Sequence, residues 1–181
     1  MRSLVVAACA AAFVFGLSSC SEDEPPETTA PTSVDRNDEV PPVLPAQVAE
    51  ATAEGAAAFG YYYVMLLDHA ARTGRITELE EVSRPECSGC RYYIDLFEGI
   101  YRDGGSVRDR HWSISGSEVH MRTKGVLRSS VRTTLRITTG TVQTRTGEAP
   151  HRYEGLSRPV ELVMVHDGNW RMSDFKNWNR S

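Results

Sequence analysis

The hydrophobic pattern of this chain changes its period once, near Gly104 and Gly105. Before this point apolar residues recur every three to four positions, as on one face of a helix. After it they alternate with polar residues, as in a half-buried strand. Helices that all precede the strands favour an α+β domain, in which helices pack on one face of a curved antiparallel sheet of about four strands.

Three helices are expected before the two glycines. The first covers 46–73 and places one set of residues within about 40° of a single direction: Val48, Thr52, Gly55, Phe59, Tyr62, Tyr63, Leu66 and Ala70. Tyr61 falls on the opposite side, and Gly74 is a natural stop. A short helix is expected over 77–82, with Thr77 as its cap. From Tyr92 onward, apolar residues again recur at helical spacing, which predicts a third helix that ends at Gly104 and Gly105.

The second half of the chain predicts antiparallel strands. From Leu127 to Thr138, apolar residues alternate with Arg, Ser and Thr, which indicates a strand with one buried face. An earlier strand over 112–121 is expected to bend or bulge at Gly116. Residues 160–165 are apolar on both faces and therefore predict a central strand. After a turn, residues 170–175 return as the last strand.

The first twenty residues are typical of an export signal. A short charged start precedes an apolar run, Leu4 to Leu17, that is shorter than the roughly twenty residues needed to span a bilayer. The tetrapeptide Leu17-Ser-Ser-Cys20 resembles the bacterial lipobox, which implies cleavage before Cys20 and acylation of that residue. We expect a signal peptide over 1–19 and a lipid anchor on the outer face of the bacterial cytoplasmic membrane. An ordinary secretory signal and an uncleaved anchor helix are the alternatives.

Residues 20–45 combine the lipidated cysteine with a segment rich in Pro, Thr and acids. Such a composition predicts a disordered tether, because it offers almost no large apolar side chain to bury. The remainder, 46–181, is long enough for a single α+β domain. The net charge of −4 is concentrated in the tether, and the second half of the domain is the basic half. A nucleic acid is not an expected partner outside the membrane.

Cys87 and Cys90 are the two thiols that remain once Cys9 leaves with the signal and Cys20 is acylated. In an oxidising compartment a disulfide is the simplest outcome. A redox-active pair is the alternative, since a helix start lowers a thiol pKa, although the thioredoxin plan needs a strand just before the motif. Haem attachment would need a histidine in place of Arg91, and zinc would need two further ligands. We therefore expect neither a metal nor a cofactor.

The histidines have no metal-binding spacing, and structural roles are the favoured interpretation for all of them: His69, His111, His120, His151 and His166. One of them, with an acid such as Asp68 or Glu98, can serve as a general base, because imidazole titrates near neutral pH. No residue is assigned as catalytic.

The aromatic residues suggest an apolar pocket. Candidate lining residues are Tyr62, Tyr63, Tyr93 and Trp112, whose rings supply apolar surface and whose phenol groups supply polar contacts. Packing in the hydrophobic core uses the same side chains, and it is the favoured role for Tyr62 and Tyr63, which lie on the buried arc.

Several segments together resemble an uncharacterised family of actinobacterial lipoproteins that carry a domain of unknown function after a Pro/Thr-rich tether. These segments are Gly55-Ala-Ala-Ala-Phe59 with Tyr62-Tyr63, Cys87-Ser-Gly-Cys90, 101–105, and Asp167-Gly-Asn-Trp170-Arg. The order of helices and strands, with its terminal Gly-x-Trp hairpin, is also similar to the nuclear-transport-factor-2-like (NTF2-like), or cystatin-like, cone. That resemblance implies a pocket between helix and sheet. It implies no activity, because such cones serve as enzymes, binding modules and spacers.

The leading hypothesis is a membrane-anchored envelope lipoprotein that is not an enzyme. Its domain would bind a small apolar ligand, a cell-wall component or another envelope protein. One alternative is an NTF2-like enzyme of the hydrolase or dehydratase type, which would use a pocket histidine and a carboxylate. The other is a thiol-disulfide protein that uses Cys87 and Cys90.

Overall fold

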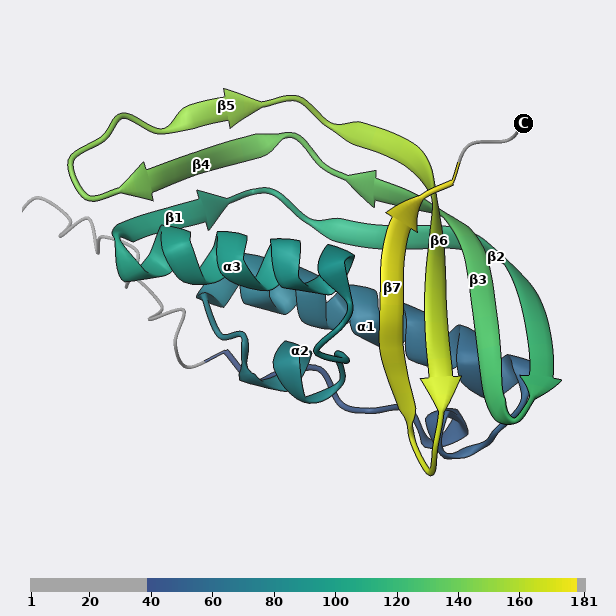
Figure 1. The fold of residues 1–181 in the computed structure, drawn as a ribbon. Coiled ribbons are helices and arrows are strands. Elements are labelled where there is room, and N and C mark those ends of the chain that lie inside the picture. Colours follow the sequence, from purple (N-terminus) through teal and green to yellow (C-terminus); the bar gives the residue numbers. More distant parts are fainter. Residues whose placement is uncertain (1–38, 179–181) are drawn as a thin grey trace, which may run out of the picture. The chain divides into compact units, whose positions relative to one another are not determined.

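The computed structural model describes residues 39–178. This part of the chain forms a 3₁₀ turn, three α-helices and then seven strands: η2 (Ala46–Ala49), α1 (Ala53–Thr73), α2 (Thr77–Glu81), α3 (Ser88–Arg102), β1 (Gly104–Arg108), β2 (Trp112–Lys124), β3 (Val126–Ile137), β4 (Gly140–Arg145), β5 (His151–Tyr153), β6 (Leu156–His166) and β7 (Trp170–Asn177). Helices precede antiparallel strands along the chain (Figure 1), so the predicted α+β class is confirmed. The predicted signal peptide and Cys20 lie outside the described residues.

The strands form two antiparallel sheets, where the sequence predicted a single sheet. One sheet has the order β2-β3-β6-β7 and the other the order β1-β4-β5. Links of two or three residues join β1 to β2, β3 to β4 and β5 to β6, so the chain passes three times from one sheet to the other (Figure 1). The short strands β1, β4 and β5 escaped prediction because glycine and polar residues interrupt their apolar alternation.

The predicted features of the four-stranded sheet are confirmed. The pairing of β2 with β3 shifts its register between Ser115 and Ser117, and Gly116 between them has φ of 67°, in the left-handed region that favours glycine. Strand β6 lies between β3 and β7, as expected for a strand with apolar residues on both faces.

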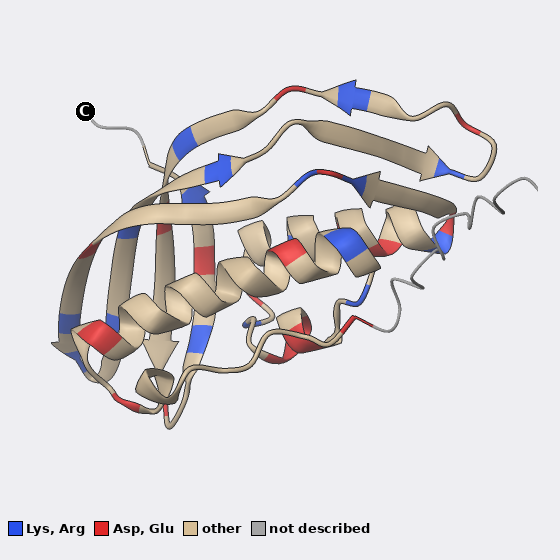
Figure 2. Ribbon diagram, turned by 180° about the vertical axis from the view of Figure 1, so that it is seen from behind, with Lys and Arg blue, Asp and Glu red and all other residues tan. Residues whose placement is uncertain are grey.

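Helix α1 begins at Ala53, later than predicted. Thr52 caps it by accepting a hydrogen bond from the Gly55 backbone nitrogen at 3.1 Å, and the preceding residues form the separate turn η2. Helix α1 carries Glu54 in its first turn and Asp68 and Arg72 in its last two turns, with no acid, lysine or arginine between Glu54 and Asp68 (Figure 2). Near its middle, a Cβ on Gly60 would lie 3.3 Å from Leu162 Cδ1, so the helix packs directly on the four-stranded sheet.

The first turn of α3 is fixed against β7. Cys87 precedes the helix and forms the expected disulfide with Cys90; both residues are buried. A Cβ on Gly89 would collide with the carbonyl oxygen of Phe175, so the helix start touches the backbone of the strand. The cap predicted for α2 is absent, because Thr77 is the first residue of that helix and Ile76 precedes it without a side-chain hydrogen bond.

The helix phase can be tested by comparing Phe59→Ala with Tyr61→Ala. Phe59 is 1% exposed and Tyr61 is 53% exposed. Phe59→Ala should lower the free energy of unfolding by about 3 to 5 kcal/mol through lost burial and the cavity that remains. Tyr61→Ala should change it by about 0.5 kcal/mol or less. Urea denaturation followed by circular dichroism measures both values, and equal losses would contradict the burial described for α1.

Candidate functional site

A cavity of about 670 Å³ opens between α3, the β1-β4-β5 sheet and the strands β6 and β7. This volume is within the range that accommodates drug-sized molecules. Aliphatic side chains and six aromatic rings make up most of its lining; the rings belong to Tyr92, Tyr93, Phe97, Trp112, Tyr153 and Phe175. A cavity between a helix and a sheet is the arrangement that the cone resemblance implied.

The aromatic rings contact one another across the elements that surround the cavity. Tyr93 on α3 stacks on Phe175 of β7, with ring centroids 5.4 Å apart. Phe97, one turn further along α3, meets Trp112 of β2 edge-on at 5.7 Å. Aromatic contacts of this kind add to the stabilisation from burial. They join α3 to two strands and so fix one wall of the cavity.

Two arginines lie among these apolar walls. The guanidinium carbon of Arg110, from the link between β1 and β2, lies 5.1 Å from the ring centroid of Tyr153 and 5.7 Å from that of Trp112. Arg158, from β6, donates from Nη2 to the Tyr93 hydroxyl at 3.2 Å. Three donors, Arg110 Nη1, Arg158 Nε and Trp112 Nε1, are buried without a hydrogen-bond partner. Neither guanidinium forms an ion pair with a carboxylate of residues 39–178.

The pKa of Tyr93 reflects both guanidinium groups. Burial raises this pKa above its ordinary value of 10.0, whereas Arg158 and Arg110 oppose the rise through their positive charges. The phenol therefore stays protonated at neutral pH, and both arginines act electrostatically on its hydroxyl.

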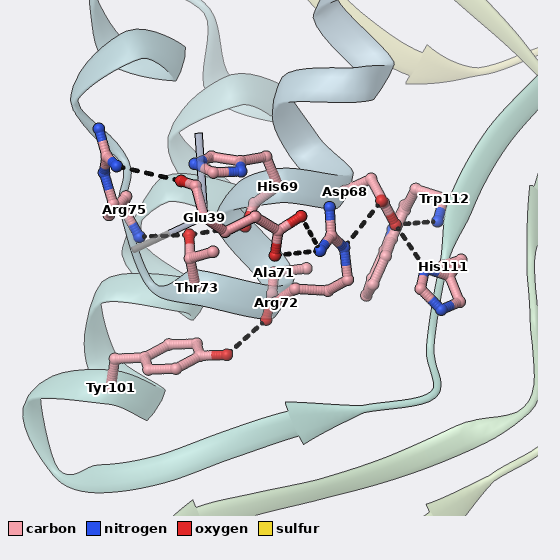
Figure 3. Close-up of polar contacts among 10 residues, drawn as sticks. All are labelled: Glu39, Asp68, His69, Ala71, Arg72, Thr73, Arg75, Tyr101, His111 and Trp112. Atoms are coloured by element: carbon pink, nitrogen blue, oxygen red, sulfur yellow. Dashed lines mark hydrogen bonds and ion pairs between the residues drawn. The ribbon is translucent and has the colours of Figure 1, made fainter. Parts of the chain in front are cut away.

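The link that carries Arg110 is held by α1, as Figure 3 shows, and by Thr138, which follows β3. Asp68 on α1 accepts a hydrogen bond from the Trp112 backbone nitrogen at 2.9 Å and lies 3.4 Å from His111 Nδ1. Thr138, just after β3, accepts from the His111 backbone nitrogen at 2.8 Å. These contacts fix the backbone on the C-terminal side of Arg110.

The C-terminal end of α1 also binds the described end of the predicted tether. The carboxylate of Glu39 pairs with Arg72, which is itself 3.0 Å from Asp68, and the Glu39 carbonyl oxygen accepts from Arg75 at 3.2 Å (Figure 3). The segment from Glu39 to Pro45 was expected to be part of the tether. In the structure, Glu39 is attached to the domain.

The structure separates the four candidate pocket residues. Tyr93 and Trp112 line the cavity. All four are buried in the core, but Tyr62 and Tyr63 do not line the cavity, and the Tyr63 hydroxyl shares a hydrogen bond of 3.1 Å with Ser83. Both lie on the face of α1 that packs on other elements, whereas the cavity lies beside α3.

Sequence reasoning missed the two arginines, although one of them left a signal. Arg158 is in phase with Val160 and Leu162 at a period of two, so it lies on the face of β6 that is otherwise apolar. An arginine on such a face needs a partner or a function, because burying an unpaired charge is costly. Arg110 lies in a link without periodicity, and only the fold brings it to the cavity.

Among the residues that line the cavity, none is a histidine, aspartate or glutamate. Lys176 is there, but it lies 3.6 Å from Glu161 and 3.4 Å from Asp174. The pair of His111 and Asp68 lies outside the lining. Residues 39–178 hold no group of three or more potential metal ligands, and none of their helices has the length and apolarity to cross a membrane.

His69 gives the domain a pH-dependent stability. It is 1% exposed, both ring nitrogens are buried without a hydrogen-bond partner in the described chain, and burial lowers its pKa below the ordinary 6.5. The unfolded chain thus binds a proton more readily, so stability present above about pH 6.5 is lost as the pH falls towards the lowered pKa. His69→Leu should reduce the loss of unfolding free energy between about pH 7.5 and about pH 5.5. Denaturant melts across this pH range measure the unfolding free energy, and His151→Gln, at an exposed histidine, is the control. If the unfolding free energy of His69→Leu depends on pH as strongly as that of the unchanged protein, the role of His69 is refuted.

Comparison with known proteins gives one family and distant structural similarities. No curated protein matches the sequence. A Xanthomonas campestris structure described as a calcium/calmodulin-dependent protein kinase II association domain is 12% identical, with a TM-score of 0.42 over 79% of this chain and 99% of that one. A Pseudomonas putida structure described as a polyketide cyclase is 12% identical, with a TM-score of 0.36 over 66% of this chain and 90% of that one. The model of a family of unknown function, DUF6318, matches residues 29–176, and the chain therefore belongs to that family.

Proposed function

We propose that this protein is a binding module for a small, largely apolar molecule. The observation that carries the proposal is the open cavity of about 670 Å³ with its aromatic and aliphatic walls. Cavities of this size and lining are the usual sites for small ligands, because they remove most of a ligand's apolar surface from water. Phenol and guanidinium groups at the cavity supply the few polar contacts that orient a ligand.

Binding is a better account of this cavity than acid-base catalysis. A hydrolase or dehydratase of the expected type needs a histidine and a carboxylate directed at the same substrate atoms. Two histidine–carboxylate pairs occur in the described chain, His111 with Asp68 and His120 with Glu118, and both lie outside the lining. Asp68 has a structural role, because it also accepts a hydrogen bond from the Trp112 backbone nitrogen. The disulfide likewise has an evident structural position at the start of α3, with both cysteines buried.

For its location, we propose attachment to the outer face of the bacterial cytoplasmic membrane through acylated Cys20. This part of the proposal rests on the sequence, namely the apolar run from Leu4 to Leu17 and the lipobox-like Leu17 to Cys20. A tethered domain would be positioned to take a ligand from the envelope. A cell-wall component or an envelope protein remains the alternative partner.

Ligand binding can be tested with the uncharged fluorescent probe N-phenyl-1-naphthylamine. Val142 lines the cavity, whereas Val126 is an exposed residue of β3 outside the lining. Val142→Trp should weaken probe binding by about tenfold or more, equivalent to about 1.4 kcal/mol, because the indole occupies part of the cavity. Val126→Trp is the matched control and should bind like the unchanged protein. If the unchanged protein fails to bind the probe, or both variants bind equally well, the cavity is not the site.

Membrane attachment is tested with Cys20→Ala. This change should leave the precursor unprocessed or release the protein from the membrane fraction, because the acylated thiol is the anchor. Intact mass measurement of the native mature protein should give an acylated Cys20 as its first residue. An unmodified mature chain that begins at another residue would contradict the anchor.

A further inference from the structure

We propose that the ligand of the cavity carries an anionic oxygen head group, such as a carboxylate or phosphate monoester, bound by Arg110 and Arg158. The apolar body of the same molecule then lies along the aromatic wall of α3. This inference rests on the proposed binding function and adds the chemical class of the ligand.

The charged residues that line the cavity are all cations. Its lining contains three cations, Arg110, Arg158 and Lys176, and no aspartate or glutamate. The charge of Lys176 is met by Glu161 and Asp174. In the described part of the chain, no carboxylate meets either arginine. Two positive charges therefore face the cavity without an anionic partner.

Both arginines keep hydrogen-bond donors that have no partner. A guanidinium group has five N–H donors, all in its plane. The rings of Trp112 and Tyr153 lie at cation–π distances from the Arg110 guanidinium, and its Nη1 still has no hydrogen-bond partner. Arg158 uses Nη2 on the Tyr93 hydroxyl, and its Nε has no partner. Both groups are held in place, yet donors remain for an acceptor.

The backbone around Arg110 is held in place by its neighbours. A Cβ on Gly140 would lie 2.7 Å from Arg110 Cβ and 2.8 Å from its backbone nitrogen, so β4 approaches the link closely only because glycine stands there. Thr138 and Asp68 hold the residues that follow. A charged group fixed before binding loses little conformational entropy when its ligand arrives.

These observations define a ligand with two parts. Planar guanidinium groups match the spacing of two oxygens on a carboxylate or phosphate, and hydrogen bonds between such charged groups are about twice as strong as neutral ones. The aromatic wall from Tyr93 to Trp112 suits an alkyl chain or a ring system. A medium-chain alkyl acid is therefore a suitable probe of the site.

The experiment compares three ten-carbon ligands that share one alkyl chain: decanoate, decyl phosphate and decanol. Each is titrated into the full chain with bound N-phenyl-1-naphthylamine, whose displacement gives the affinity. At low salt, the unchanged protein should prefer at least one of the two anions over decanol by about tenfold or more. The preferred anion distinguishes a carboxylate from a phosphate ligand. This preference should decrease from 50 mM to 500 mM NaCl, whereas decanol binding should not weaken.

Arg110→Met and Arg158→Met assign the preference to the two arginines. Methionine keeps an apolar stem of similar length but carries no charge, so binding of the anion should weaken more than binding of decanol, and the preference for the anion should fall to about threefold or less. Arg152→Met is the matched control, because Arg152 is an exposed residue of β5 that lies near Glu154 and outside the lining. Thermal melts identify any variant that does not fold, and the salt dependence of the unchanged protein tests the inference without a variant.

The outcomes separate this inference from the proposed function. If the unchanged protein binds decanol as tightly as both anions, the anionic ligand is refuted and the binding function stands. If both arginine variants fold and keep the preference, the assignment to Arg110 and Arg158 is refuted. If neither the probe nor any of the three ligands binds, the proposed function itself fails.

Discussion

The close packing of two helices on the four-stranded sheet is the constraint on which the rest of the domain depends. Helix α1 approaches β6 at Gly60, where even a methyl group would lie 3.3 Å from Leu162 Cδ1. Helix α3 meets the backbone of β7 at Gly89, and the adjacent disulfide of Cys87 and Cys90 fixes its first turn. Burial of the aromatic and aliphatic residues between these layers supplies the driving force for folding. Because α3 is fixed in this way, the wall that it contributes to the cavity has a defined position.

The second sheet adds a further wall to the cavity. Strands β1, β4 and β5 form this sheet, and their side chains line the cavity opposite those of α3. Arg110 and Arg158 reach this space from the link between β1 and β2 and from β6. Asp68 connects the site to α1 through the Trp112 backbone. The position of Arg110 therefore depends on the packing of a helix that does not line the cavity.

The sequence pattern predicted those parts of the fold that depend on neighbouring residues alone. The alternation around β3, the bulge at Gly116 and the stop at Gly74 follow from side-chain periodicity and backbone sterics. The second sheet has short strands, whose pairing depends on distant partners, such as Val107 with Val142. Tyr62 and Tyr93 are equally aromatic in sequence and both are buried in the core, and only the packing of their helices brings Tyr93, and not Tyr62, to the cavity. Arg158 was detectable from its phase on β6, and Arg110 was not.

We propose that the cavity beside α3 binds an amphipathic anion next to Trp112. The most direct measurement is a proton–nitrogen correlation spectrum that resolves the indole groups during a titration with decanoate. Trp112 Nε1 lacks a partner at the cavity, whereas Trp170 Nε1 already donates to the Glu50 carbonyl oxygen at 2.9 Å. The account predicts a saturable shift of the Trp112 indole signal and an unmoved Trp170 signal. An unmoved Trp112 signal, or equal shifts at both tryptophans, would contradict it.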